Sequence, residues 1–535
     1  TPTLDFTTGN DAGNGIIGLY LNGNTEIKDY TKGITVGNSV GTNYAIGVYA
    51  KAQGTGGSYS ITTPIKVGAD GVGIYADKNS NITYTGNMEV GDGTKSGTGI
   101  YITKKDGTGT ATGTVTLGSN TIKLKGTGGV AVIASEGTKF DAKNATIELI
   151  GKNVTGVGVY GLKGSDVKTG GWTFKNNGNQ AEEVRLVEGK VHVTSSKSLN
   201  PRMVLTHVIN GETSVGTGAT VTSVSDGSYT AKENIGLMAE GVKNPTAPAP
   251  LTSWDEADFE AVNNGTINFS AAEKSTAIYV NSARAKNDGT IKIGKNSIAI
   301  YGFYDKNTRK YDGATGNPNK LEIETTGNSK ISLGDQSTGM YLINAEKINN
   351  TGGEITSTTG AKRNVGIYAV NGQDADNDNN KVLTMTTATK MTLGDGAVGI
   401  YSKGQSNTVR NTVTNTGDIT VGDKIVASKT ENYPAVAVYA ENTNLTNTSA
   451  IRVGNDGIAY YGKNSTINAN GSVDFSNKGV LAYLENSIFI SKLGNLGATQ
   501  NTMLYLKDST AQLDGAGTKV DIDVADGYTG AYISG

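Results

Sequence analysis

Ile65-Lys-Val-Gly-Ala-Asp-Gly-Val-Gly-Ile-Tyr-Ala76 is the stretch from which the chain is built, because close relatives of it recur from one end to the other. Its first half is an apolar-x-apolar-Gly core, and its second half is a small-apolar-Tyr core. The first core also begins at Ile34, Met88, Val115, Ile291, Ile331, Met391, Ile419 and Ile451. The second also ends at Tyr20, Tyr49, Tyr101, Tyr160, Tyr301, Tyr341, Tyr368, Tyr401, Tyr439 and Tyr461. In most copies the spacing between the cores is constant and in a few it is longer, which indicates two short strands joined by a turn that accepts insertions.

Residues alternate between apolar and polar within each core. Ile65 and Val67 share one face against Lys66, and Val72, Ile74 and Ala76 are expected to share one against Gly73 and Tyr75. A period of two predicts strands with one buried face. Two-residue hairpin turns do not separate these strands, so each is expected to pair with its counterpart one repeat later. The sequence therefore predicts an all-β, right-handed parallel β-helix of about eighteen rungs.

Two further elements follow from the repeat. Asn-Gly pairs such as Asn264-Gly265 often precede the first core, and they predict corners with a positive φ angle. The tyrosines are expected to point outward and to stack as an external ladder. A platform for sugars is the less favoured function of that ladder, because a specific site would not repeat in every rung.

Composition restricts the possible functions. The chain has 47 basic and 49 acidic residues and no long run of either sign, so nucleic acid is not expected as a partner. It contains no cysteine, which excludes disulfides, thiolate zinc sites and cysteine nucleophiles. No long apolar run or signal peptide is visible, and we expect the chain to be a piece of a larger protein. No cofactor is expected.

The repeat divides the chain into three parts. It is regular over 1–171, nearly vanishes over 172–262 and resumes over 263–535. The middle part holds both tryptophans, both histidines and four of the eight prolines. We expect an irregular insertion or subdomain there, on a β-helix that continues on either side.

Departures from the repeat supply the candidate binding residues. An exposed aromatic side chain beside amides and charges can stack on a sugar or anchor a protein partner. The candidate ligand-binding residues, from 172–262 and from the loop 303–313, are Trp172, Trp254, Tyr304, Arg309 and Tyr311. The alternative is that these aromatic side chains pack an inserted loop against the β-helix.

Catalysis and metal binding are not expected. The only histidines, His192 and His207, lie in strand-like sequence without a Gly-x-Ser-x-Gly elbow, so a Ser/His triad is disfavoured. Carboxylates alternate at Asp374-Ala-Asp-Asn-Asp378, as they do at the start of a calcium loop. The glycine and distant glutamate of that loop are missing, so a solvated loop is favoured over a metal site.

The linked pattern Asn-x-Gly-x-Ile-x-Val-Gly, followed by Gly-Ile-Tyr-Ala, resembles the passenger regions of the large type Va autotransporter adhesins of fusobacteria. The resemblance covers nearly all of the chain except 172–262. It implies a monomeric passenger displayed at the cell surface, exported through a C-terminal outer-membrane barrel. It also implies binding to other bacteria, to galactose-type glycans or to host-cell receptor proteins, including those of immune cells. A non-enzymatic adhesin segment is the leading interpretation. A passenger enzyme acting on polysaccharide or protein, and a stalk whose tip lies elsewhere, are the alternatives.

Overall fold

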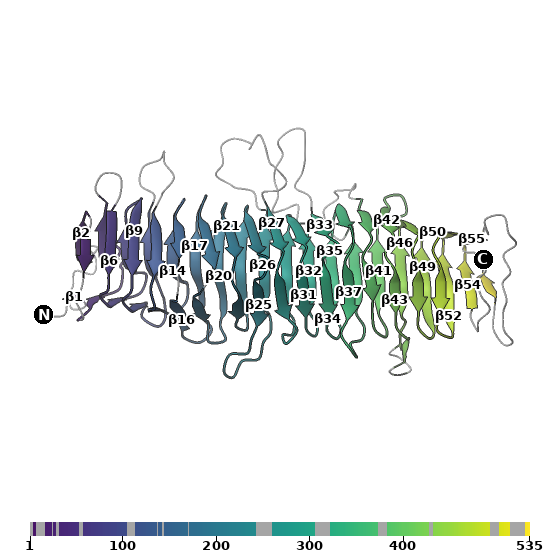
Figure 1. Cartoon of the computed structure of the whole chain (residues 1–535), viewed down its shortest axis with the longest axis horizontal. Helices are drawn as coiled ribbons and strands as arrows, with labels where there is room; N and C mark the ends of the chain where they lie inside the picture. The colour runs from purple at the N-terminus through teal and green to yellow at the C-terminus, as the bar shows by residue number, and fades with distance from the viewer. Residues whose placement is uncertain are drawn as a thin grey trace, which may run out of the picture. The chain divides into compact units, whose positions relative to one another are not determined.

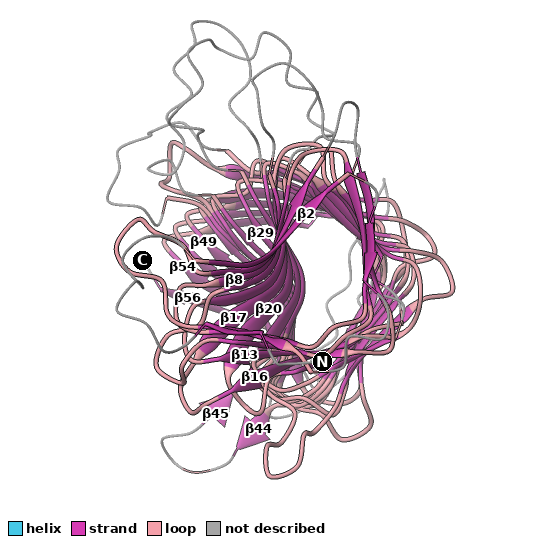
Figure 2. Ribbon diagram, turned by 90° about the vertical axis from the view of Figure 1, so that its left-hand side faces the viewer, coloured by secondary structure: helices cyan, strands magenta, loops and turns pink. Residues whose placement is uncertain are grey.

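The computed structural model describes most of the chain and contains strands and loops in its described part, without a helix (Figure 2). The described residues are 4–6, 16–23, 25–27, 32–52, 57–103, 113–135, 137–141, 144–169, 171–241, 259–304, 321–372, 382–426, 428, 432–492, 502–513 and 530–534. They form two compact units, an N-terminal unit (Thr1–Glu240) and a C-terminal unit (Gly241–Gly535).

The N-terminal unit contains three kinds of strand, which follow one another in each rung. The first strands are β1 (Leu4–Phe6), β4 (Ile34–Val36), β7 (Ile65–Val67), β10 (Met88–Val90), β13 (Thr121–Lys125), β16 (Thr146–Ile150), β19 (Thr173–Lys175), β22 (Lys197–Leu199) and β25 (Thr220–Ser223). The second strands are β2 (Ile17–Asn22), β5 (Ile46–Lys51), β8 (Val72–Ala76), β11 (Thr98–Ile102), β14 (Gly129–Ala134), β17 (Thr155–Gly161), β20 (Gln180–Val187), β23 (Met203–Ile209) and β26 (Ile235–Glu240). The third strands are β3 (Thr25–Ile27), β6 (Gly57–Ile61), β9 (Ser80–Tyr84), β12 (Thr114–Leu117), β15 (Lys139–Asp141), β18 (Asp166–Thr169), β21 (Lys190–Val193) and β24 (Glu212–Val215).

The C-terminal unit repeats the same order. Its first strands are β28 (Thr266–Phe269), β31 (Thr290–Ile293), β34 (Lys330–Leu333), β37 (Glu354–Ser357), β40 (Lys390–Thr392), β43 (Ile419–Val421), β48 (Ile451–Val453) and β51 (Val473–Phe475). Its second strands are β29 (Thr276–Asn281), β32 (Ile298–Phe303), β35 (Thr338–Ile343), β38 (Val365–Val370), β41 (Val398–Lys403), β46 (Val436–Glu441), β49 (Gly457–Lys463), β52 (Gly479–Glu485), β54 (Thr502–Lys507) and β56 (Ala531–Ser534). Its third strands are β27 (Glu260–Asn263), β30 (Arg284–Asn287), β33 (Glu322–Thr325), β36 (Lys347–Asn350), β39 (Thr384–Thr387), β42 (Asn411–Asn415), β47 (Thr443–Asn447), β50 (Thr466–Ala469), β53 (Ile488–Ser491) and β55 (Thr510–Leu513). A short antiparallel hairpin, β44 (Ile425–Val426) and β45 (Asn432–Tyr433), lies between β43 and β46.

Within each unit, strands of one kind pair in parallel with their counterparts in the neighbouring rungs, except that the first strands β19 and β22 belong to separate sheets (Figure 1). Ile65 of β7, for example, lies opposite Ile34 of β4 and Met88 of β10. All three side chains are buried, so stacked apolar residues fill the interior of the rungs. These sheets confirm the predicted parallel β-helix. The described chain has nine second strands in the N-terminal unit and ten in the C-terminal unit. These numbers are close to the expected total of about eighteen rungs.

In the second strand, the alternation between inward and outward residues is interrupted at the glycine. The predicted outward direction of this glycine is therefore wrong. Gly73 was expected to point outward with Tyr75, but a Cβ atom at Gly73 would lie 2.4 Å from Sδ of the buried Met88. Gly73 and Ile74 therefore both face the interior, and only a small residue fits beside the core side chain. Buried alanines such as Ala299 and Ala437 occupy the same position in other rungs.

The corners before the first strands agree with the prediction in part, because a positive φ angle occurs at some of their glycines and not at their buried asparagines. The buried asparagines before the first strands, including Asn263, Asn287 and Asn415, do not have a positive φ angle. Instead, Nδ2 of Asn263 donates to Oδ1 of Asn287 at 2.7 Å, so these side chains bond from rung to rung. Positive φ angles occur at the other two corners, for example at Asn79, and at this corner they occur at glycines such as Gly353. Asparagine suits this position because its side-chain amide can both donate and accept hydrogen bonds.

The region 172–262 is more regular than expected. Its described part up to residue 241 carries β19 to β26, and β20 pairs in register with both β17 and β23. These described residues form rungs of the β-helix, and 242–258 of the region lie outside the described residues. The Gly-apolar-Tyr motif disappears, but inward residues such as Val184 and Leu186 remain apolar and buried. The strand depends on those inward residues, so the rung survives the loss of the motif.

Candidate functional site

A ladder of stacked tyrosines lines the outer face of the second strands, as predicted. In the C-terminal unit it runs without a break through Tyr279, Tyr301, Tyr341, Tyr368, Tyr401, Tyr439, Tyr461, Tyr483, Tyr505 and Tyr532. Successive ring centroids are 4.2 to 5.6 Å apart, and the planes differ by 4° to 13°. Burial raises the pKa of Tyr401 and Tyr461 to about 12, so their hydroxyl groups stay protonated at neutral pH.

The stacking favours a structural role for this ladder over a sugar platform. A sugar packs its C–H groups against a free aromatic face. Each ring inside the ladder has a neighbour on both faces, so it presents its edge and hydroxyl group to solvent. The ladder therefore stabilises the rungs and leaves little aromatic surface for a ligand.

The same ladder is interrupted in the N-terminal unit. Four tyrosines, from Tyr20 to Tyr101, stack at 5.2 to 5.4 Å with planes tilted by 30°. The next second strands carry Ile133 and Tyr160 in register, and then Arg185, His207 and Met238 take the tyrosine position. We call Arg185, His207 and Met238, with Glu182 and Glu240 beside them, the polar window. It is the candidate functional site of the described chain.

His207 is clamped at the centre of the polar window. Its Nδ1 lies 3.2 Å from Oε1 of Glu182, and its Nε2 lies 3.0 Å from Oε2 of Glu240. Arg185 adds a weaker contact, with Nη1 3.8 Å from the same Glu182 oxygen. Burial alone would lower the pKa of His207, but the hydrogen bonds and negative charges of the two glutamates outweigh it and raise the pKa to about 9. The imidazole is therefore a cation at neutral pH, and a cation held by two carboxylates cannot act as a general base.

The other histidine contacts a serine without forming a triad. Nδ1 of His192 lies 2.8 Å from Oγ of Ser214 on the neighbouring third strand. No carboxylate bonds His192 among the residues that the structure describes. Ser214 also lies inside the paired strand β24, where ladder hydrogen bonds engage the backbone amides that an oxyanion hole would need. The pair thus lacks two of the parts of a serine hydrolase.

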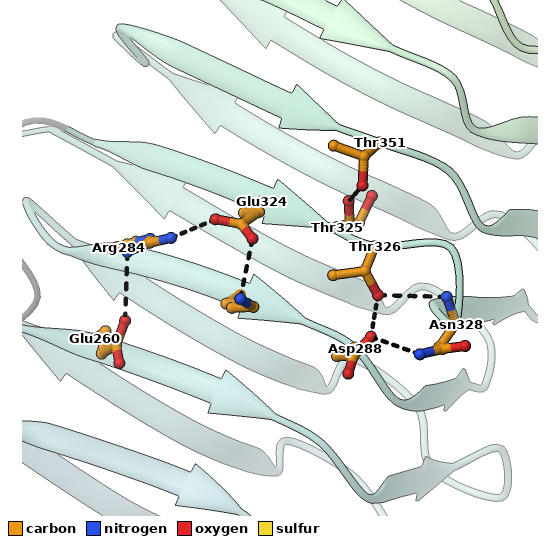
Figure 3. Close-up of polar contacts among 9 residues, drawn as sticks. Glu260, Arg284, Asp288, Glu324, Thr325, Thr326, Asn328 and Thr351 are labelled. Carbon is orange, nitrogen blue, oxygen red and sulfur yellow. Dashed lines mark hydrogen bonds and ion pairs between the residues drawn. The ribbon is translucent and has the colours of Figure 1, made fainter.

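Charges on the third strands of the C-terminal unit neutralise one another (Figure 3). Arg284 lies between Glu260, 3.9 Å away, and Glu324, to which it donates a hydrogen bond, and Nζ of Lys286 lies 3.0 Å from Glu324. Partial burial acts to raise the pKa of Glu324, but the hydrogen bonds and positive charges of Lys286 and Arg284 lower it overall. Alternating charges on adjacent strands stabilise their register.

A polar cluster lies beside those charges at the end of the third strands (Figure 3). Thr326 and Asn328 both donate to Oδ1 of Asp288, Asn328 through Nδ2 at 3.1 Å. Thr351 donates to the carbonyl of Thr325 at 3.3 Å. These bonds satisfy the polar groups within the corner, so this cluster is structural.

Two of the five predicted binding residues, Trp172 and Tyr304, lie in the described structure, and both are buried. Trp172 is 3% exposed and packs edge-on against Phe140, and Tyr304 is 5% exposed. Neither side chain presents the exposed ring that the prediction requires, because Trp172 fills the space beside Gly158 and Tyr304 packs at the end of β32. Trp254, Arg309 and Tyr311 lie outside the described residues, as do Asp374 to Asp378.

Sequence reasoning missed the polar window although one signal was available. When Gln180–Val187 is aligned on the repeat, Glu183 falls on the glycine position and Arg185 on the tyrosine position.

Among the described residues, no group of acidic, histidine or cysteine side chains could hold a metal ion, and no helix is long and apolar enough to cross a membrane.

No protein-family model, curated protein or solved structure matches this chain.

Proposed function

We propose that this chain is a segment of a non-enzymatic cell-surface adhesin, as its resemblance to autotransporter passengers implies. In this proposal the rungs provide reach and rigidity, and selected connections provide recognition. The partners would be host-cell receptor proteins or galactose-type glycans, and other bacteria. The charge ladders and stacked tyrosines support a scaffold role, because the rungs satisfy their own polar and aromatic groups.

The observation that carries the proposal is where the long connections fall. In the C-terminal unit, residues 304–321 join β32 to β33 and residues 371–383 join β38 to β39, whereas 282–283 suffice between β29 and β30. Both long connections leave the ladder strand toward the third strand, at one corner of the rung. In the N-terminal unit, 103–113 join β11 to β12 at the same corner. Long connections also occur elsewhere, as at 422–435 between β43 and β46, but the ones named here share one corner, where loops on a rigid solenoid can bind together.

Shortening these connections tests the proposal. Replacing 306–319 by Gly-Ser-Gly keeps the buried Tyr304 and Leu321, and a second variant replaces 373–381 in the same way. Attachment of the purified chain to epithelial cells and to bacteria is expected to fall at least tenfold in the double variant. The matched control shortens 427–431, between β44 and β45 at a different corner, and is expected to attach normally. Equal attachment by all variants would exclude these connections, and no attachment by the unaltered chain would favour a stalk.

A further inference from the structure

A buried lysine and a buried glutamate meet inside the N-terminal unit, beneath the polar window. Glu183 occupies the inward position of β20 that holds glycine or alanine in most rungs, and Lys197 points inward from β22. Their side chains are 1% and 5% exposed, and Nζ of Lys197 lies 2.5 Å from Oε1 of Glu183. This is the most deeply buried ion pair among the described residues.

Trp172 holds the lysine in place. Nζ of Lys197 donates a hydrogen bond of 2.7 Å to the carbonyl oxygen of Trp172, and it lies 5.1 Å from the centre of the Trp172 ring. The first-strand sheet is interrupted here, since β19 and β22 belong to separate sheets. The lysine thus bonds a carbonyl just before β19, at a break in the sheet where its side chain can cross between rungs.

The contact between the two groups is not an ordinary ion pair. Oε1 of Glu183 is fully buried and has no hydrogen bond of acceptable geometry within the described part of the chain, although the lysine nitrogen is so close. The nitrogen therefore approaches off the usual hydrogen-bonding direction. Burial raises the pKa of Glu183, and the nearby positive charge of Lys197 opposes that rise without cancelling it. Condensation requires a proton to pass from the ammonium group to the carboxylate, and an apolar site favours the neutral carboxyl group that results.

We propose that Lys197 and Glu183 condense to an intramolecular amide cross-link. The lone pair of Nζ attacks Cδ of the protonated Glu183 carboxyl group, and a C–N bond forms. The nitrogen then gives up one proton, the Cδ–O bond to the hydroxyl group breaks, and the two leave together as water. The reaction involves no change in oxidation state and needs no further reactant.

Two physical conditions favour this reaction inside the β-helix. Fixing two reacting groups in contact raises their effective concentration by many orders of magnitude. The buried position also removes the water that would hydrolyse the amide, since both side chains are at most 5% exposed. The chain has no cysteine, so an amide is the covalent staple open to it. The cross-link would tie β20 to β22, across the break in the first-strand sheet.

Mass spectrometry of the unaltered chain under denaturing conditions tests the proposal. The expected mass is lower than that of the sequence by one water, and trypsin is expected to release a branched peptide that joins the segments around Glu183 and Lys197. The variant Lys197→Arg is expected to show the full mass, because a guanidinium group does not condense. Since the unaltered chain decides the question, a folding defect in the variant leaves the test intact.

An exposed pair in the same unit provides the internal control. Nζ of Lys190 lies 2.8 Å from Oε2 of Glu212, but the lysine side chain is 63% exposed and hydrated. After unfolding, trypsin is expected to cleave after Lys190 and amine-labelling reagents to modify it, whereas Lys197 is blocked. An unaltered chain of full mass, cleaved after Lys197 as readily as after Lys190, would overturn the proposal.

Discussion

The second strands of both units carry a tyrosine ladder, which is continuous in the C-terminal unit and interrupted in the N-terminal unit. In the C-terminal unit ten rings stack nearly parallel without a break. In the N-terminal unit the stacked ladder ends at Tyr101 and Ile133 takes the next position. After Tyr160, Arg185 and His207 follow in the same register. The backbone pairing continues through both regions, so the ladder position can be exchanged without loss of the rung.

The difference distinguishes rungs that keep the repeat, which form the scaffold, from rungs that lose it and gain other polar contacts. Where the repeat is kept, outward and inward faces are both satisfied by identical neighbours one rung away. Where it is lost, the outward face gains the His207 clamp and the inward face gains the Glu183–Lys197 pair. Strand β20 takes part in both changes, because its outward Glu182 contacts His207 of β23 and its inward Glu183 contacts Lys197 of β22.

The largest effect is expected from breaking the buried pair beneath the polar window. Lys197→Met leaves Glu183 buried without its partner, and removal of one partner of a buried pair costs about 3–5 kcal/mol. Hydrogen exchange of β20 to β23, followed by mass spectrometry, should show a corresponding loss of protection. The control Lys190→Met removes the exposed pair with Glu212 and should cost less than about 1 kcal/mol. Equal losses for the two variants would show that burial is not the deciding factor.

A somewhat smaller effect is expected from opening the continuous ladder. Tyr401→Ala removes a ring that stacks on Tyr368 and Tyr439, at 4.7 and 4.5 Å. Two lost stacks and the lost burial should destabilise the C-terminal unit by about 3 kcal/mol, measured by urea denaturation. Tyr20→Ala is the control, because Tyr20 is 48% exposed and has one stacked neighbour in the described ladder, Tyr49. A control as destabilising as Tyr401→Ala would refute the stacking explanation.

The smallest effect is a pH dependence confined to the N-terminal unit. The pKa of His207 is about 9 in the folded state, above its ordinary value of 6.5. The clamp therefore contributes fully below pH 6.5, weakens as the pH rises toward 9 and is lost above it. The change should be about 2 kcal/mol over that window, read from denaturation at pH 6.5 and pH 9. His207→Gln should remove this dependence, and a variant that keeps it would assign the titration to another group.

Part of the candidate site could have been read from the sequence. The strands, the ladder and the loss of the motif after Gly171 were all visible, and aligning β20 on the repeat places Arg185 at the tyrosine position. The contact between Glu183 and Lys197 was not visible in the sequence. It depends on the path of the corner between β21 and β22, which sets the position of Lys197 at the start of β22. The burial of Trp172 was hidden for the same reason, since the space that it fills is created by Gly158 of the preceding rung.

The sequence by itself determined the repeating strands, their parallel pairing and the stacked tyrosines, because period-two patterns and identical residues at fixed spacing specify each rung locally. Only the tertiary structure decided which faces the glycines, asparagines and tryptophan take. Each of these residues has neighbours one rung away, and those neighbours are dozens of residues distant in the chain. Whether a group is buried or exposed is settled by those neighbours, and its own local sequence carries no record of them.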